Sequence, residues 1–196
     1  MRRRASWWMV VALLAAGCAG PGTKGPAASD ATDVWFMQHM VPHLLQTTAI
    51  VDLAGDRITR PKLARLADTI NQQQQAHLVQ LQAWLAGRGL APYDPQQHPS
   101  SGKETDLQRL SRVDGTKLDL AFLKVMTARH RAGSKLAATE LRDGTLPEVR
   151  QLAHKLLTEQ QTQIGQMTVW NRAWSKAHTS YPSATAPSPS LADDHQ

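Results

Sequence analysis

Two stretches of the chain repeat the same pattern of apolar positions, and each stretch contains two helical segments. In the first stretch, apolar residues recur at steps of three and four from Phe36 to Val51, and again from Leu63 to Leu85. This spacing places the apolar side chains on one face of an α-helix. No segment shows the alternation of apolar and polar residues, flanked by turns, that predicts a strand in a hairpin. The pattern therefore predicts helices only.

A shift of 86 residues brings the second stretch onto the first without a gap. Pro61 then meets Pro147, in each case after a break in the apolar pattern, and proline suits the first turn of a helix. One hairpin is too small to bury its apolar face alone, so we expect the two hairpins to pack around a pseudo-twofold axis as an all-α, four-helix bundle. Further matched pairs are Asp33 and Asp119, Phe36 and Phe122, Met40 and Met126, Leu66 and Leu152, Gln74 and Gln160, and Trp84 and Trp170.

Composition divides the rest of the chain into segments. Gly, Pro, Ala and Ser dominate before the first helix, and Ser, Thr, Pro and Ala dominate after the last one, as is typical of tethers and disordered tails. The connection between the two hairpins is long and rich in Pro, Gln and Ser, and we expect it to cross the bundle with a short helix around Asp106 to Val113. The predicted organisation is a signal peptide at 1–17, a flexible tether at 18–29, the bundle at 30–176 with repeats at about 33–86 and 119–172, and a disordered tail at 177–196.

The N-terminus has the features of an exported lipoprotein. Three arginines precede an unbroken apolar run at 7–16, which is shorter than the roughly 20 residues that span a bilayer. Small residues then lead to Cys18, the only cysteine in the chain, in an arrangement that resembles a bacterial lipobox. We expect cleavage before Cys18 and its lipidation, which would anchor the protein in the cell envelope, on the extracytoplasmic side of a bacterial membrane. The alternative is a plain secretory signal in which the cysteine is incidental.

Charge and cysteine content exclude several classes of partner and site. The formal charge of the chain is +6, and removal of residues 1–17 takes away three arginines and no acids, which leaves +3. The two aromatic residues near the histidines are not interleaved with basic residues, so no nucleic-acid partner is indicated. A single cysteine excludes an internal disulfide framework and a Cys-rich zinc site.

The residues at the repeated positions resemble the motifs of a known family. Asp33, Phe36, Met40, Pro42 and His43 follow the opening motif D-x-x-F-x-x-x-M-I-P-H-H of the domain of unknown function 305 family. The resemblance covers about 140 residues and implies a ferritin-like helical bundle, often exported, with copper held by His and Met side chains in some members. Its other matches are Leu66, Ala67, Ile70, Gln74, Leu78, Trp84 and Leu85 in the first half, and Asp119, Phe122, Met126, His130, Leu152, Ala153, Gln160, Ile164, Met167 and Trp170 in the second.

The sequence departs from the family pattern at the histidines. The His-His pair is replaced by His43 and leucine in the first half, and by Arg129 and His130 in the second. The glutamate on the second helix of each half is replaced by His77 and Gln163. Each half therefore keeps one histidine of the pair, and not the equivalent one.

A cluster of His39, Met40, His43 and His77 is the candidate metal site. Cu(I) prefers thioether and imidazole ligands, whereas Cu(II) accepts imidazole and oxygen. His39 and His43 are four residues apart and share a helix face with Met40, and His77 lies near the inward stripe of the second helix. Each of these residues also has an alternative role without a metal. In that case His39 would face solvent, Met40 and Met126 would fill the core, His43 would be a hydrogen-bonded core histidine, and His77 would lie at the surface edge.

Two glutamines and an arginine are expected to support this site or the helix register. Gln74 and Gln160 lie in otherwise apolar stripes, and a buried amide needs partners. We expect them to bond across the bundle to His43 and to His130 or Arg129, either orienting an imidazole or fixing the helix register. Arg129 stays charged and disfavours a metal in the second half, and it is expected to attract an anion or to pair with Asp33 or Asp119.

The sequence contains no complete catalytic motif. It lacks paired Glu-x-x-His motifs, Gly-x-Ser-x-Gly, His-Glu-x-x-His, a phosphate-binding loop and a catalytic cysteine, so we expect no enzyme. Two hypotheses follow. In the first, the protein binds a transition metal, copper in particular, through His and Met. In the second, it is a degenerate member without a metal or other cofactor, which serves as an envelope scaffold or protein-interaction module with an unidentified partner.

Overall fold

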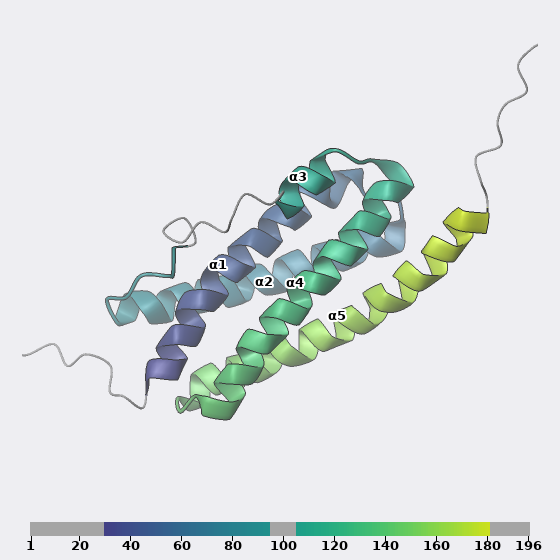
Figure 1. The fold of residues 1–196 in the computed structure, drawn as a ribbon. Coiled ribbons are helices and arrows are strands. Elements are labelled where there is room, and N and C mark those ends of the chain that lie inside the picture. The colour runs from purple at the N-terminus through teal and green to yellow at the C-terminus, as the bar shows by residue number, and fades with distance from the viewer. Residues whose placement is uncertain (1–29, 95–104, 181–196) are drawn as a thin grey trace, which may run out of the picture.

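The computed structural model describes residues 30–94 and 105–180, and this part of the chain is mostly helical, with no strands (Figure 1). Four long helices form the bundle, which confirms the predicted all-α, four-helix architecture. Two short helical segments lie between them. The helices are α1 (Ala31–Ala54), η2 (Gly55–Arg57), α2 (Pro61–Gly87), α3 (Asp106–Ser111), α4 (Gly115–Asp143) and α5 (Pro147–Ser180).

The sequence signals for helix starts match the structure, and the last helix extends past the boundary predicted for the bundle. Pro61 and Pro147 are the first residues of α2 and α5, and α3 lies within the predicted short helix. However, α5 continues to Ser180, beyond the predicted end at residue 176. Earlier in α5, Trp174 stacks on Trp170, and the Arg60 guanidinium lies 4.4 Å from the centre of the Trp174 ring. The predicted signal peptide, Cys18, the tether and the tail from residue 181 onward lie outside the described residues.

The two hairpins join along α1 and α4. Helix α1 packs against α2 within its own hairpin, against α4 of the other hairpin, and against the short α3. It is therefore surrounded on several sides, which explains why buried residues occur all around it rather than on one narrow stripe. None of the described helices combines the length and the apolar character needed to cross a membrane.

Each hairpin turn is bound by an aspartate from the other hairpin. The Asp119 carboxylate of α4 accepts hydrogen bonds from Thr59, at 3.0 Å from the backbone nitrogen and 2.6 Å from Oγ1. The Asp33 carboxylate of α1 accepts from the backbone nitrogens of Thr145, at 3.1 Å, and Leu146, at 2.8 Å. The 86-residue offset relates Asp33 to Asp119 and Thr59 to Thr145. The two contacts are therefore the same interaction made twice, in opposite directions across the pseudo-twofold axis.

A proline inside α1 determines where the chain lies after α2. Pro42 has no backbone N–H, which leaves the carbonyl of Gln38 without its usual helical donor. The backbone nitrogen of Tyr93 donates to that carbonyl at 3.0 Å, and Gln38 Nε2 donates to the carbonyl of Ala91 at 2.8 Å. Gly89, at φ +65°, makes the left-handed turn after α2 that directs the chain back toward α1. The segment after α2 is thus bound to the surface of α1.

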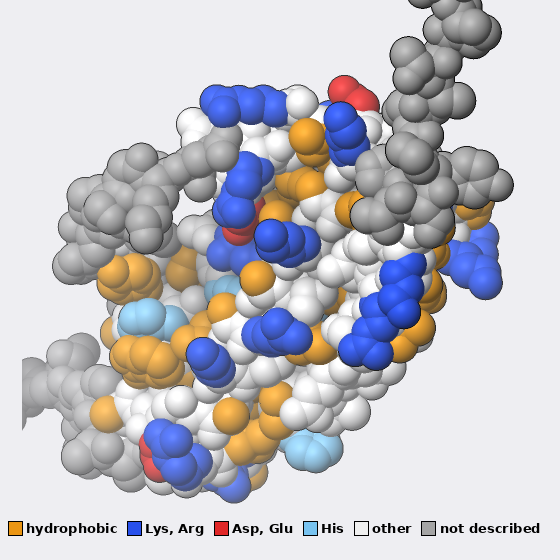
Figure 2. Space-filling view, turned by 45° about the vertical axis from the view of Figure 1, so that its right-hand side comes forward, with side chains coloured by type: hydrophobic (Ala, Val, Ile, Leu, Met, Phe, Trp, Pro, Cys, Tyr) orange, Lys and Arg blue, Asp and Glu red, His pale blue; other side chains and the backbone are white. Residues whose placement is uncertain are grey.

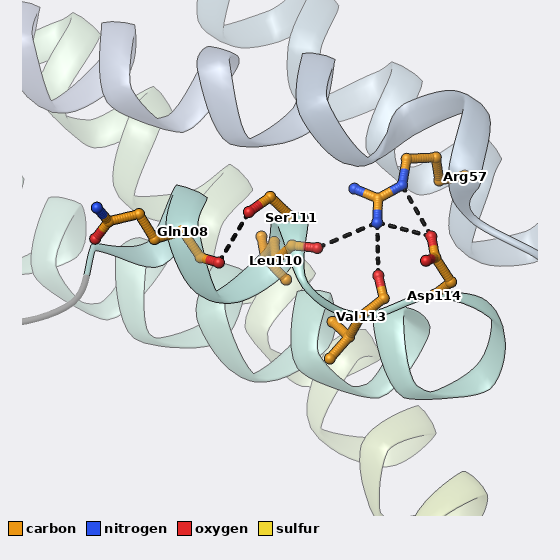
Figure 3. Close-up of polar contacts among 6 residues, drawn as sticks. All are labelled: Arg57, Gln108, Leu110, Ser111, Val113 and Asp114. Atoms are coloured by element: carbon orange, nitrogen blue, oxygen red, sulfur yellow. Dashed lines mark hydrogen bonds and ion pairs between the residues drawn. The ribbon is translucent and has the colours of Figure 1, made fainter.

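A single arginine connects the first hairpin turn to the start of α4 (Figure 3). The Arg57 guanidinium donates to the carbonyls of Val113, at 2.6 Å, and Leu110, at 3.3 Å, and to Asp114 Oδ1, at 2.7 Å. The two carbonyls lie at the C-terminal end of α3 and in the link to α4, where helix geometry leaves acceptors free. Arg57 therefore holds η2, α3 and α4 together.

Glu140 is a buried carboxyl in the last turn of α4, next to the link between α4 and α5. It is fully buried beneath Gly144, whose missing side chain leaves space for the carboxyl group. Burial and the neighbouring Asp33 carboxylate raise the pKa of Glu140 to about 8, although the Arg150 guanidinium opposes this shift. Asp33 itself stays ionised, because backbone hydrogen bonds from Leu146 and Thr145 outweigh the effect of its burial and lower its pKa.

The raised pKa of Glu140 predicts a loss of stability as the pH rises. The folded protein holds this proton up to about pH 8, whereas the unfolded chain releases it near pH 4.5. Stability should therefore fall between these two pH values and level off above them. Urea unfolding at a series of pH values should show a flatter profile for Glu140→Gln than for the unsubstituted protein. The matched change Glu148→Gln, at an exposed position, should leave the profile unchanged, and parallel profiles for Glu140→Gln would contradict the assignment.

Candidate functional site

A layer of polar side chains divides the hydrophobic core in two. One apolar cluster contains Met126 and Met167, and the other contains Met37 and Met40. Between them, each long helix contributes buried polar or small residues at about the same height of the bundle. These are His43 and Thr47 from α1, Gln74 and His77 from α2, His130 and Gly133 from α4, and Gln160 and Gln163 from α5.

His43 contributes a buried ring nitrogen to this layer. Its side chain is 9% exposed, and Nε2 is buried without a hydrogen-bond partner among the described residues. Burial lowers the pKa of His43 to about 4, with smaller contributions from the charges of Arg129 and His130. The imidazole is therefore neutral at pH 7, and a neutral imidazole can bind a metal ion.

Gly133 brings α4 close to His43. A β carbon at Gly133 would lie 2.7 Å from His43 Nε2 and 2.7 Å from Gln160 Nε2, closer than side chains normally approach. The two nitrogens are therefore no farther apart than twice that distance. Gln160 Oε1 accepts a hydrogen bond from Ser134 at 3.2 Å, whereas its Nε2 has no partner among the described residues. Helices α1, α4 and α5 meet at this point because residue 133 has no side chain.

His130 is bound on its Nε2 by a chain of amides. Its Nε2 lies 2.6 Å from Gln163 Oε1, and Gln163 Nε2 donates to Gln73 Oε1 at 2.7 Å. An amide oxygen only accepts, so His130 carries its proton on Nε2. Burial lowers the pKa of His130 to about 4, and the bond to Gln163 opposes that shift. Nε2 is therefore occupied by a hydrogen bond and unavailable to a metal, whereas the buried Nδ1 has no hydrogen-bond partner among the described residues.

His77 belongs to the seam between α2 and α5. Its Nε2 lies 2.7 Å from Glu159 Oε2, and the His77 side chain is 3% exposed. Two grooves lie beside this pair. One of about 600 Å³ extends past Gln80, Gln151 and His154, and one of about 240 Å³ includes Thr69, Gln73 and Gln166; both share Thr158 and Glu159. His77 thus has a carboxylate partner, which the sequence did not indicate.

The other two predicted ligands lie in different surroundings. Met40 is fully buried within an apolar cluster. His39 donates from Nδ1 to the carbonyl of Trp35 at 2.7 Å, and its ring is stacked between Trp35, at 4.3 Å, and Tyr93, at 4.7 Å. Across residues 30–94 and 105–180, no three His, Cys, Asp or Glu side chains gather as a group that could hold a metal ion. The assignment of His39, Met40, His43 and His77 as ligands stays a prediction.

The predicted partners of the buried polar residues were wrong. Gln160 bonds to Ser134, and Gln74 Oε1 has no hydrogen-bond partner among the described residues, so neither bonds to His43. Gln163 takes the role at His130 that was expected of Gln74 or Gln160. The reason is helical phase, because Gln163 lies one turn beyond Gln160 and reaches His130 at the register that α4 and α5 adopt.

Arg129 was also expected to have other partners. It donates to Gln46 Oε1 at 2.6 Å and forms an ion pair with Asp106 at 3.7 Å. The predicted pairing with Asp33 or Asp119 was wrong, because those carboxylates bind the two hairpin turns. Arg129 therefore lies at the outer edge of the polar layer, where its charge contributes to the lowered pKa of His43.

Comparison with known proteins identifies the family. The sequence profile described as "Domain of unknown function (DUF305)" matches residues 33–171. The chain belongs to this family. DUF305 is thus the family that the repeated motifs indicated, and its solved members share the helical fold seen here. No curated protein matches the sequence.

Several solved DUF305-like structures resemble this chain. One, from Streptomyces coelicolor and described as a secreted protein, is 24% identical, with a TM-score of 0.67, covering 76% of this chain and 95% of the other. A DUF305 fragment from Deinococcus radiodurans is 23% identical, with a TM-score of 0.63, covering 72% and 96%. A protein named CopM, in its Cu(II)-bound form, is 23% identical, with a TM-score of 0.64, covering 72% and 97%. CopM was also solved in Cu(I)-bound and silver-bound forms. At these identities the likeness shows a common fold.

Proposed function

We propose that this DUF305 protein binds copper, as Cu(I), with His43 as its principal ligand. The observation that carries the proposal is the buried and neutral His43 imidazole, whose Nε2 has no partner among the described residues. A buried polar atom without a partner costs free energy, so a bound water or ion at this position would be stabilising. Copper-bound structures of CopM, which has the same fold, support the choice of metal.

The chemistry of the surrounding side chains suits a soft, monovalent ion. Met40 lies three residues before His43 on α1 and is fully buried, and thioether and imidazole are ligands that Cu(I) accepts. The carboxylate-rich sites preferred by hard divalent ions are not found among the described residues. The Arg129 guanidinium near His43 repels any cation, and it repels a divalent ion more strongly than Cu(I). His43 with Met40 is therefore the ligand pair that we propose.

We further propose that the protein is exported and lipid-anchored through Cys18, and that it binds rather than catalyses. Its resemblance to a structure described as that of a secreted protein supports an extracytoplasmic location. The lipid anchor rests on the lipobox-like sequence before Cys18. Under this proposal the bundle would hold copper at the outer side of a bacterial membrane.

A second candidate function is that of a scaffold without metal. It is favoured by the engagement of the other histidines, since His77 pairs with Glu159 and His130 bonds to Gln163. The charge of Arg129 next to the polar layer also disfavours a cation. Under this alternative, the polar layer serves to define the register of the four helices.

Copper titration of three variants separates the two functions. We expect the chain from Ala19 to Gln196, which lacks the Cys18 thiol, to bind one Cu(I) under anaerobic conditions against a chromophoric competitor. His43→Ala should abolish this binding, because it removes the proposed principal ligand, whereas His130→Ala should retain it. Protons should compete only near pH 4, the pKa of His43.

Two further results make the copper test decisive. Met40→Leu conserves volume and apolar character, so it should weaken Cu(I) binding while the circular dichroism spectrum stays unchanged. This variant keeps the test informative if His43→Ala unfolds. Binding no tighter than that of a denatured control would support the scaffold, and equal loss in the His43 and His130 variants would contradict the assignment to His43.

A further inference from the structure

The outward face of α4 carries a straight row of basic residues. Lys117, Lys124, Arg131 and Lys135 are all exposed. At about 100° per residue they fall within an arc of roughly 40° around the helix axis, and at about 1.5 Å per residue they extend over roughly 27 Å. These four residues are called the α4 basic row below.

No exposed acid of α4 offsets this charge before its last residue. The two earlier acids, Asp119 and Glu140, are fully buried. The exposed acids at the two ends are already paired, Asp114 with Arg57 and Asp143 with Arg142. Figure 2 shows Lys and Arg side chains spread over this side of the bundle, with few Asp or Glu among them. The net charge of the chain is small once the signal segment is removed, so this distribution is asymmetric.

The residues between the cations are small. The other exposed residues of α4 before Arg142 are Ala128, Ala132 and Ala138. Protein partners are usually bound through aromatic or other large apolar anchors at the centre of an interface, and the exposed residues of α4 include none. A layer of anionic headgroups is different, because it attracts Lys and Arg by charge alone, at about 1 kcal/mol for each residue near the surface.

We propose that the α4 basic row docks the bundle onto an anionic lipid bilayer. Long Lys and Arg side chains on a straight row can reach phosphate groups in one plane, which is the geometry that a bilayer presents. This contact would lay α4 along the membrane surface. It is independent of copper binding and of the lipid on Cys18, and it adds an orientation that an anchor alone does not supply.

Vesicle binding tests the docking surface. The chain from Ala19 to Gln196 should co-sediment with vesicles of phosphatidylcholine mixed with phosphatidylglycerol, and not with phosphatidylcholine alone. Binding should weaken at high salt, because screening shortens the range of the charges. The triple variant Lys124→Gln, Arg131→Gln, Lys135→Gln should bind about 100-fold more weakly, as expected for the loss of three cations near the surface.

A matched variant separates the position of the charge from its amount. Lys62→Gln, Arg65→Gln, Arg88→Gln removes three exposed cations from α2 and its C-terminal cap, outside α4, and it should retain most of the binding. Equal loss in the two triple variants would overturn the proposal, since net charge would then explain the binding. Binding without preference for anionic vesicles, or tighter binding to duplex DNA than to these vesicles, would also overturn it.

Discussion

Replacing Asp119 with alanine should lower the free energy of unfolding by about 3 kcal/mol, as is typical when one partner of a buried, charged hydrogen-bond group is removed. The carboxylate is fully buried and accepts from Thr59 N, Thr59 Oγ1 and, at 3.0 Å, Arg60 Nη1. Its loss leaves both donors of Thr59, in the turn of the first hairpin, without their acceptor. Urea unfolding followed by circular dichroism measures the effect.

The repeat-related change Asp33→Ala should have a similar effect on the turn of the second hairpin. Asp33 accepts from Thr145 and Leu146, and its pKa is lowered by these backbone bonds, so the folded state favours the ionised form. Asp33 is fully buried like Asp119, so urea unfolding should show a loss of stability of similar size for Asp33→Ala.

An exposed carboxylate provides the control for both aspartates. Asp68→Ala on α2 removes the same side chain from an exposed position, and surface changes of this kind usually shift stability by no more than about 0.5 kcal/mol. An effect of Asp119→Ala or Asp33→Ala as small as that of Asp68→Ala would contradict the role of these residues in joining the hairpins.

Two glycines in helices should respond to alanine with opposite signs. Gly165→Ala in α5 meets nothing within 4 Å and should stabilise the protein by up to about 1 kcal/mol through helix propensity. Gly133→Ala introduces a β carbon 2.7 Å from His43 Nε2 and from Gln160 Nε2. Overpacking of this kind typically costs about 1–3 kcal/mol, so a net destabilisation is expected.

The Gly133 variant also bears on the proposed copper site. The added methyl group would displace the His43 ring or occupy the space beside Nε2, so Cu(I) affinity should fall together with stability. Gly165→Ala should leave copper affinity unchanged. Stabilisation by Gly133→Ala equal to that of Gly165→Ala would show that α4 approaches His43 less closely than described here.

The helices were predictable because their determinants are local. Apolar spacing of three and four residues decides which face of a helix is buried, and Pro61 and Pro147 begin α2 and α5 as their chemistry requires. The end of α5 at Ser180 lies beyond the predicted boundary, because Ser, Thr and Ala near residue 176 carry no apolar period. Trp174, six residues before this end, contacts Arg60, which is distant along the chain.

The polar layer could be predicted only in part. Met40, Gln74 and Gln160 were expected to face inward, and all three are buried. Their partners could not be read from periodicity, because a shift of one helical turn between α4 and α5 decides whether Gln160 or Gln163 meets His130. Gly133 and Glu159 were missed. The only available signal for Gly133 was a glycine within a helix, and Glu159 had no signal, because its partner His77 lies 82 residues earlier in the chain.

The amino-acid sequence by itself determined the helical class, the duplicated hairpins and the family, since each depends on spacing within about 20 residues or on a repeat offset of 86. Only the tertiary structure decided which buried polar groups meet. Asp33 and Asp119 bind the turn of the opposite hairpin, Arg129 faces Gln46 and Asp106, and His43 keeps a free nitrogen beside Gly133. The physical reason is that a side-chain contact between helices depends on register and on rotamers, which the packing of all four helices sets together.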